Sequence, residues 1–152
     1  NDESLSGMGT TCVAAIVDSG KVYVAHVGDS RAYIISADGK LTQLTRDHSM
    51  VQDLVESGEL TPEEAKSFPG KNIITRAIGV DSRVTVDFDE SDFTQDDILI
   101  LCTDGLTNYV SDDEIVSAVT SASTCFEYAE KLVDLANENG GGDNITVVSI
   151  VS

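Results

Sequence analysis

The sequence has little of several residue types that mark specialised classes of protein. Its 152 residues include no tryptophan, two prolines, three cysteines and nine lysines and arginines, and aromatic residues make up 5%. No apolar run approaches the ~18 residues of a membrane span, and no cationic segment precedes an apolar stretch as in a secretory signal. The rest, 41% hydrophobic and 24% charged residues, excludes collagen-like, coiled-coil and disordered chains. Length and composition predict one globular domain spanning residues 1–152.

The shortage of basic residues leaves the chain strongly acidic. Nine Lys and Arg against 27 Asp and Glu give a formal net charge of −18. This charge repels nucleic acids and anionic membranes over about a Debye length, and it favours cations as ligands. Residues 84–130 alone hold twelve carboxylates and no Lys or Arg. This stretch is either a solubilising surface or one side of a cleft that attracts divalent cations and basic phosphopeptides.

The three cysteines form no recognisable framework. Cys12, Cys102 and Cys125 are odd in number, widely spaced and set among apolar neighbours. That pattern fits neither a set of disulfides nor a C-x-x-C metal site. We expect three small buried side chains in a protein of the reducing cytoplasm.

Turn signals divide the first half of the chain into an antiparallel meander. The Asp38-Gly39 pair is typical of a hairpin turn, because the centre of a two-residue loop needs positive φ. Residues 98–102 are apolar at every position, which predicts a strand covered on both faces. The predicted strands are 10–17, 22–27, 32–36, 41–45, 73–74, 84–88, 98–102 and 144–151.

Two capping boxes predict the starts of helices, one opening at Thr61 and one at Ser111, each with a Glu three residues later. Apolar spacing adds helices over 50–55 and 126–137. The polar helical stretch between Asp47 and Lys71 lies between strand regions, so we expect it to stand off the body as a lobe. The order of strands, then helices, then a strand predicts an α+β fold with antiparallel sheets.

Three aspartates follow or precede apolar strands and lie beside glycine. Asp104 follows residues 98–102, Asp143 follows three glycines, and Asp29 follows residues 22–27. Carboxylates held at the end of a sheet suit a hard divalent cation such as Mg²⁺ or Mn²⁺. The alternative is that Asp104 and Asp143 only cap turns and that Asp29 forms a salt bridge or turn with Arg31.

Other candidate motifs are weaker. Residues 87–97 are acidic enough for a calcium loop, but Asp92 stands where a glycine is needed and Ile98 where a bidentate Glu belongs. This stretch is better interpreted as a solvated acidic edge. His26 and His48 have no Ser or Cys nucleophile nearby in the sequence, and we expect His26 on a strand face and His48 on the surface of the lobe.

Six short motifs occur together along the chain. Taken in order, they resemble those of the metal-dependent serine/threonine protein phosphatases of type 2C (the PPM family) in their bacterial form, and the resemblance runs from Gly7 to the C-terminus. The motifs are Gly9-Thr10-Thr11, Val27-Gly28-Asp29-Ser30-Arg31, Thr45-Arg46-Asp47-His48-Ser49, Ile74-Thr75-Arg76-Ala77-Ile78-Gly79, Thr103-Asp104-Gly105-Leu106 and Gly142-Asp143-Asn144-Ile145-Thr146.

The resemblance implies an antiparallel β-sandwich flanked by helices, with two metal ions, Mn²⁺ or Mg²⁺, at one end of the sheets. It assigns Asp104 and Asp143 to metal binding and Asp29 to a third, weaker metal. Residues 48–71 correspond to a flap beside the cleft, with His48 and Ser49 at its start. The implied reaction is hydrolysis of phosphoserine and phosphothreonine on proteins, opposing a Ser/Thr kinase, by a water that two cations about 3.5–4 Å apart activate.

The chain departs from the family pattern before Gly9. It lacks an early acidic metal ligand, a phosphate-binding arginine and an Asp-Gly-x-Gly-Gly-His segment, and it begins at Asn1 rather than Met. We therefore expect the carboxy-terminal two-thirds of the domain, incomplete on its N-terminal side, with half a metal site, no retained catalytic residue and little activity alone. Missing strands would leave sheet edges open to self-association.

Two other functions stay open at this point. A non-catalytic module could keep the phosphatase fold and act as a binding or regulatory partner. A plain Mg²⁺- or Ca²⁺-binding domain would also explain the acidic composition.

Overall fold

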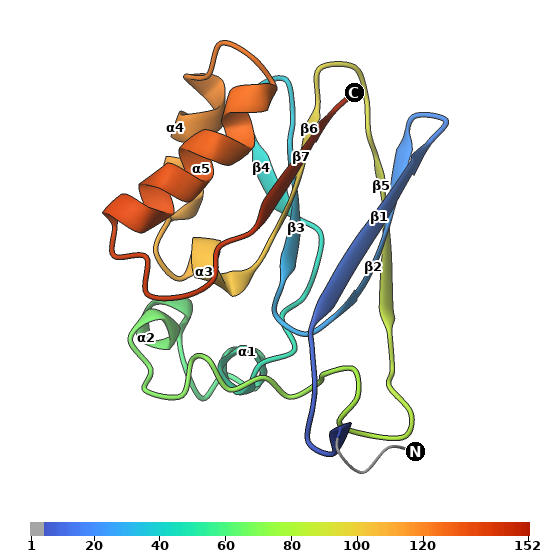
Figure 1. Ribbon diagram of the computed structural model, residues 1–152, viewed down its shortest axis with the longest axis vertical. Coiled ribbons are helices and arrows are strands. Elements are labelled where there is room, and N and C mark those ends of the chain that lie inside the picture. The colour runs from blue at the N-terminus through green and yellow to red at the C-terminus, as the bar shows by residue number, and fades with distance from the viewer. Residues whose placement is uncertain (1–4) are drawn as a thin grey trace.

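Two antiparallel sheets form the body of the molecule and pack face to face (Figure 1). The computed structural model describes residues 5–152. One sheet has three strands in the order β1-β2-β5, and the other has four in the order β4-β3-β6-β7. The strands are β1 (Cys12–Asp18), β2 (Lys21–Val27), β3 (Arg31–Ile35), β4 (Leu41–Gln43), β5 (Asp87–Asp92), β6 (Ile98–Cys102) and β7 (Val147–Val151).

The inner faces of the two sheets meet in an apolar core. Along β2, alternate residues point inward, because successive side chains of a strand lie on opposite faces. Val22 and Val24 are buried against Ala32 and Ile34 of β3 and Leu99 of β6. This layer holds the sheets together and therefore fixes where their ends lie relative to each other.

Helices cover the outer face of the four-stranded sheet. They are α3 (Asp104–Thr107), α4 (Asp112–Thr120) and α5 (Phe126–Glu138). Ile115 of α4 and Leu132 of α5 pack in one cluster with Tyr33 and Ile100 of the sheet. Strand β6 is thus covered on both faces, which confirms the prediction from its continuous apolar run. The capping box at Ser111 is present as predicted.

The lobe contains α1 (Met50–Glu56) and α2 (Pro62–Lys66) and lies beyond one end of the sheets, below α3 in Figure 1. Thr61 and Glu64 form the predicted capping box, and Gly58 has a φ of +78° after α1. The α+β class predicted from sequence is confirmed.

Two strand predictions are wrong or displaced. Residues 73–74 form no strand, and Ile74 makes only an isolated bridge to Ser49. The strand predicted over 84–88 is displaced to β5, Asp87–Asp92, which forms one edge of the three-stranded sheet, so the acidic stretch 87–97 begins with an edge strand. The acidic sequence of β5, with Phe88 as its one apolar residue, hid a strand whose partner, β2, is far away in the chain.

The predicted burial of the cysteines holds for Cys102 alone. Cys12 is exposed on the outward face of β1, and Cys125 is exposed at the cap of α5. Val13, beside Cys12, points to the opposite face of β1, and Phe126, beside Cys125, is itself exposed. Within residues 5–152, no helix combines the length and apolar character needed to cross a membrane.

Candidate metal centre

The strand register places the three predicted aspartates at one end of the sandwich. Arg31 at the start of β3 pairs with Cys102 at the end of β6, which pairs with Val147 at the start of β7. Asp104 follows this row and Asp143 precedes it, while Asp29 lies in the connection from β2 to β3 that crosses between the sheets. The three aspartates, far apart in the chain, therefore lie at the same end of the sheets.

Thr103 fastens the end of β6 to the segment before β7. Its backbone N–H donates to the carbonyl of Thr146 at 3.1 Å, and its hydroxyl donates to the carbonyl of Asn144 at 3.0 Å. The same hydroxyl accepts the Thr146 N–H at 3.0 Å. These three bonds set the separation between the residues that follow Thr103 and those that precede Thr146.

Gly105 lets the backbones approach closely at this junction. A Cβ at this position would lie 2.3 Å from the carbonyl oxygen of Asn144, which is impossible without moving the backbone. The neighbouring carboxylates, Asp104 and Asp143, consequently interact. Burial raises the pKa of Asp104 above its usual range, and the negative charge of Asp143 raises it further.

Asp29 is held by a second tight glycine. Gly28 has a φ of +108°, and a Cβ there would lie 2.3 Å from the Thr11 side chain. Burial raises the pKa of Asp29 to about 6, with a further contribution from the charge of Asp104. Asp104 thus interacts with Asp29 on one side and with Asp143 on the other, so a cation beside it would relieve repulsion in both pairs.

The alternative interpretation of Asp29, a salt bridge to Arg31, is wrong. The Arg31 guanidinium instead forms an ion pair with Asp47, because its Nε and Nη2 donate to the Asp47 carboxylate at 2.6–3.1 Å. Its Nη1 donates to the Tyr33 hydroxyl at 2.8 Å. Among the residues that the structure describes, no ion pair engages Asp29. Its carboxylate is therefore available to a ligand.

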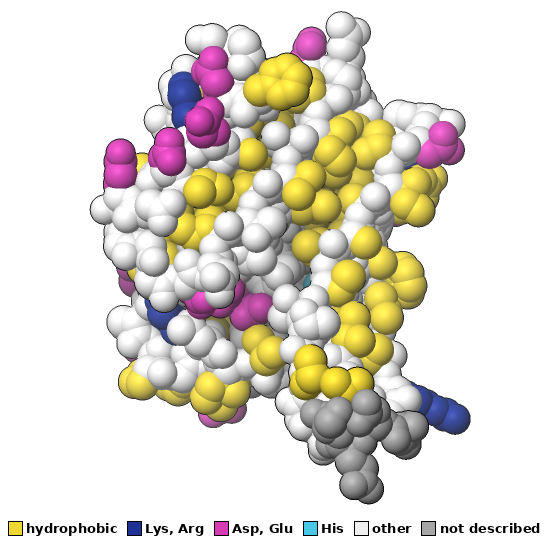
Figure 2. Space-filling view, in the orientation of Figure 1, with side chains coloured by type: hydrophobic (Ala, Val, Ile, Leu, Met, Phe, Trp, Pro, Cys, Tyr) yellow, Lys and Arg dark blue, Asp and Glu magenta, His cyan; other side chains and the backbone are white. Residues whose placement is uncertain are grey.

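A groove of about 760 Å³ runs between the lobe and the start of the helical layer. Asp29 and Asp104 line it, together with Ser49 and Lys66 from the lobe side. Figure 2 shows acidic side chains gathered near α3, where body and lobe meet. Asp143 is exposed and is not part of this lining.

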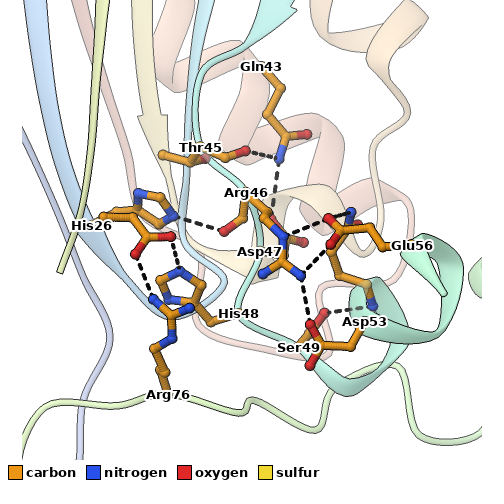
Figure 3. A network of polar contacts seen from close by, with 12 residues as sticks. His26, Gln43, Thr45, Arg46, Asp47, His48, Ser49, Asp53, Glu56 and Arg76 are labelled. Carbon is orange, nitrogen blue, oxygen red and sulfur yellow. Dashed lines mark hydrogen bonds and ion pairs between the residues drawn. The ribbon is translucent and has the colours of Figure 1, made fainter. Parts of the chain in front are cut away.

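Two histidines form a separate buried cluster that the sequence did not reveal. His26 lies on β2 as expected, but the surface position predicted for His48 is wrong, because its side chain is fully buried. The two rings stack with centroids 4.7 Å apart (Figure 3). His26, His48 and Asp87 are the one group of three His, Cys, Asp or Glu in residues 5–152 whose ligand atoms all lie within 4.8 Å of one another.

Hydrogen bonds argue against a metal in this histidine cluster. The Gly28 N–H donates to His48 Nδ1 at 3.0 Å, so the ring proton is on Nε2, which donates to Asp87 at 3.0 Å. A metal on Nε2 would have to displace that proton while Nδ1 stays occupied. The aspartates suit a cation better. Asp104 and Asp143 each accept a hydrogen bond, from the Asn108 amide and the Asn144 N–H, but a carboxylate keeps further oxygen lone pairs, and Mg²⁺ and Mn²⁺ prefer oxygen ligands.

The structure therefore describes an α+β sandwich with a carboxylate-lined groove at one end of its sheets. The chain belongs to the protein phosphatase 2C family: the family model described as "Protein phosphatase 2C" matches residues 1–56 and 86–145. The resemblance inferred from the six motifs is confirmed. The stretch that the family model skips, 57–85, covers most of the lobe and its return to the sheet.

Individual relatives agree with this assignment. The chain is 45% identical over 150 residues to the serine/threonine phosphatase stp of Listeria innocua, covering 99% of this chain and 59% of that protein. The crystal structure of the phosphatase Stp1 from Staphylococcus aureus superposes with a TM-score of 0.92 at 41% identity, covering 99% and 59% of the two chains. A catalytic domain of the phosphatase PstP, solved in complex with two manganese ions, matches with a TM-score of 0.85 at 38% identity, covering 97% and 60%. The chain thus spans about 60% of the length of these relatives.

Proposed function

We propose that this chain is one domain forming part of a metal-dependent protein serine/threonine phosphatase, which hydrolyses phosphoserine and phosphothreonine on proteins. The observation that carries the proposal is the junction of Thr103 and Gly105 with residues 144–146, which brings Asp104 and Asp143 together beside the groove. Named relatives are serine/threonine phosphatases, which supports the reaction class.

In this proposal Asp104 and Asp143 hold one Mn²⁺ or Mg²⁺, and Asp29 contributes to a weaker site. Bound ions would neutralise phosphate charge and activate a water. The chain itself would position the ligands: β6 and β7 orient the carboxylates of Asp104 and Asp143, and the β2–β3 connection orients that of Asp29. Manganese is the ion named for a PstP structure, which supports this choice of metal.

The lobe residues 48–71 act as a substrate flap in the same proposal. Ser49, Lys66 and Lys71 line the groove, and the two lysines offer positive charge to a phosphorylated chain. His48 does not line the groove, so it acts from beneath the flap. The binding partner is a phosphoprotein, and a Ser/Thr kinase would supply it.

The 152-residue chain alone should have little or no activity. Two-metal hydrolysis needs ligands for both ions, and the carboxylates here account for one main site. The shortfall of about 40% against the relatives' length is consistent with the rest of the site residing elsewhere in the longer proteins.

Calorimetry with Mn²⁺ tests the metal assignment. Asp104→Asn and Asp143→Asn should each weaken binding about tenfold or more, because each removes a charged ligand. Asp134→Asn on the exposed side of α5 removes the same charge far from the groove and should leave binding unchanged. Unchanged affinity in both site variants would contradict the assignment.

A turnover assay tests the predicted inactivity of the 152-residue chain. Turnover of p-nitrophenyl phosphate equal to that of an amino-terminally extended form would contradict the predicted inactivity.

The incomplete set of ligands favours one alternative, a non-catalytic binding or regulatory module with the phosphatase fold. Binding of phosphopeptides without turnover, in the extended form as well, would support it. A plain Mg²⁺- or Ca²⁺-binding domain is separated by the same Mn²⁺ calorimetry, because a cation bound elsewhere on the acidic surface would keep its affinity in both Asp104→Asn and Asp143→Asn.

We also place the protein in the cytoplasm and propose that the isolated chain self-associates. Three free cysteines support a reducing compartment. The edge strands β1 and β7 carry exposed apolar residues, Ile16 and Val17 on the first and Val148 and Val151 on the second. Light scattering across a range of concentrations would show a rising mass, whereas a constant monomer mass would contradict this proposal.

A further inference from the structure

One carboxylate contacts both ends of residues 48–76, the segment that contains the flap. Asp87 on β5 accepts a hydrogen bond from His48 Nε2 at 3.0 Å through Oδ2, and from Arg76 Nη1 at 2.7 Å through Oδ1. His48 stands just before α1, and Arg76 stands where the chain returns toward β5. In Figure 3 the side chains of His48 and Arg76 extend toward each other from different segments.

The opposite side of His48 holds the turn before Asp29. Its Nδ1 accepts the Gly28 N–H at 3.0 Å, and its backbone N–H donates to the Gly28 carbonyl at 2.9 Å. Gly28 is also pressed against Thr11. Bonds therefore run in series from Arg76 through Asp87 and His48 to Gly28, one residue from Asp29.

The His48 ring has little freedom to change this arrangement. It is fully buried, one face stacks on His26, and both nitrogens are engaged. His26 is fixed in turn, since its Nε2 bonds to the Arg46 carbonyl at 2.8 Å. Burial lowers the pKa of His48, which keeps the ring neutral, with its proton directed at Asp87.

Backbone hydrogen bonds also join the two ends of the segment that Asp87 contacts. The Thr75 N–H donates to the His48 carbonyl at 2.8 Å, and the Met50 N–H donates to the Ile73 carbonyl at 2.9 Å. The family match stops at residue 56 and resumes at 86, directly before Asp87. Asp87 and His48 thus lie in matched sequence and hold a segment that is mostly unmatched.

We propose that Asp87 is a positioning residue: its one carboxylate fixes both ends of residues 48–76 on the three-stranded sheet and, through His48, fixes the turn that carries Asp29. It does not line the groove, so it acts on the site through other residues. The proposed function is needed only for the statement that the Asp29 turn belongs to a metal site. The positioning of the flap is argued from the observed contacts alone.

Amide hydrogen exchange on the metal-free 152-residue chain tests this directly. Asp87→Asn keeps the shape but can accept only one of the two bonds and turns a donor toward the other. Exchange at the amides of Gly28, Met50 and Thr75 should accelerate about tenfold or more, since a hydrogen bond to a charged group is lost. Amides of β6 should keep their wild-type rates.

Asp89→Asn is the matched control. It removes the same charge from the same strand and face, but Asp89 makes no bond to the flap and only approaches His26 at 4.0 Å. It should leave all three amides at wild-type rates. Arg76→Gln should accelerate exchange at Thr75 while leaving Gly28 protected, because the His48 contact remains.

Two results would overturn the proposal. One is wild-type exchange at the three amides in Asp87→Asn. The other is an equal acceleration at β6, which would mean general destabilisation. Because no metal or substrate enters the measurement, a failure of the phosphatase assignment would leave its outcome unchanged.

Discussion

The two sheets share a core but differ in what lies outside them. The four-stranded sheet is covered by α4 and α5, and its central strands are buried on both faces. The outer face of the three-stranded sheet is bare: Ile16, Tyr23 and Phe88 are exposed, Phe88 by 77%, and Figure 2 shows hydrophobic side chains gathered over this region. The covered sheet supplies Asp104 and Asp143, whereas the bare sheet leads into Asp29 and holds the flap.

From this difference we expect the candidate site to have a more rigid half and a more adjustable half. Asp104 and Asp143 are set by a junction of backbone atoms on a doubly covered sheet. Asp29 and the flap are set by side-chain bonds on a sheet with one face open. Local stability follows buried apolar contact, so we expect the second half to open more readily.

The largest effect should come from removing the helical cover. Leu132→Ala deletes a fully buried side chain of α5 and should lower the free energy of unfolding by about 3 kcal/mol. Phe88→Thr on the bare sheet should change it by less than about 0.5 kcal/mol. Urea unfolding of both variants measures the contrast, and equal losses would show that the outer face of the three-stranded sheet is covered in solution.

Gly105→Ala tests the rigid junction itself. The added methyl group meets the Asn144 carbonyl, so we expect a loss of about 2–3 kcal/mol and weaker Mn²⁺ binding, although alanine favours a helix. Gly39→Ala is the control: its φ is +83° but nothing lies within 4 Å, so it should cost about 1 kcal/mol and spare metal binding. Unfolding and Mn²⁺ calorimetry separate the two; normal affinity in Gly105→Ala would refute the role of the junction.

The smallest effect concerns Asp29, and its size depends on pH. Its pKa is about 6 in the folded chain and near 3.8 when unfolded, so its contribution to stability is full below 3.8 and is lost as pH rises through 6. Asp29→Asn should therefore stabilise the metal-free chain at pH 7, by about 1 kcal/mol after allowance for solvent screening.

Thermal unfolding at pH 4 and pH 7 measures this effect, and the gain should nearly vanish at pH 4. Added Mn²⁺ should reduce the extra stability of Asp29→Asn at pH 7, because only the wild type keeps the carboxylate that would bind the ion. The surface variant Asp134→Asn should show neither change. A destabilised Asp29→Asn at pH 7 would mean that this carboxylate has a partner in the folded chain.

Much of the fold was predictable because its signals are local. The apolar run 98–102, the capping boxes at Thr61 and Ser111 and the helix 126–137 each depend on neighbours within a few residues. The failures depend on distant partners. β5 has an acidic sequence and is a strand because β2 lies beside it, and His48 is polar yet buried because Asp87 and Gly28 satisfy its nitrogens.

The candidate site divides in the same way. Asp29, Asp104 and Asp143 could be selected because each stands beside glycine at the end of an apolar strand. The alternative of a salt bridge between Asp29 and Arg31 is wrong, since only the fold shows that Asp47 reaches the Arg31 guanidinium. The His26 and His48 stack and the links of Asp87 to the flap had no signal in spacing, as their members come from three separate segments.

Local chemistry along the chain determined the elements, the family and the candidate acidic residues, because propensity, capping and motif order act over short distances. The tertiary structure alone decided which carboxylates meet, which histidine is buried and which sheet face stays open. The physical reason is that strand register and close backbone approach, as at Gly105 against Asn144, are set by pairing between segments remote in sequence.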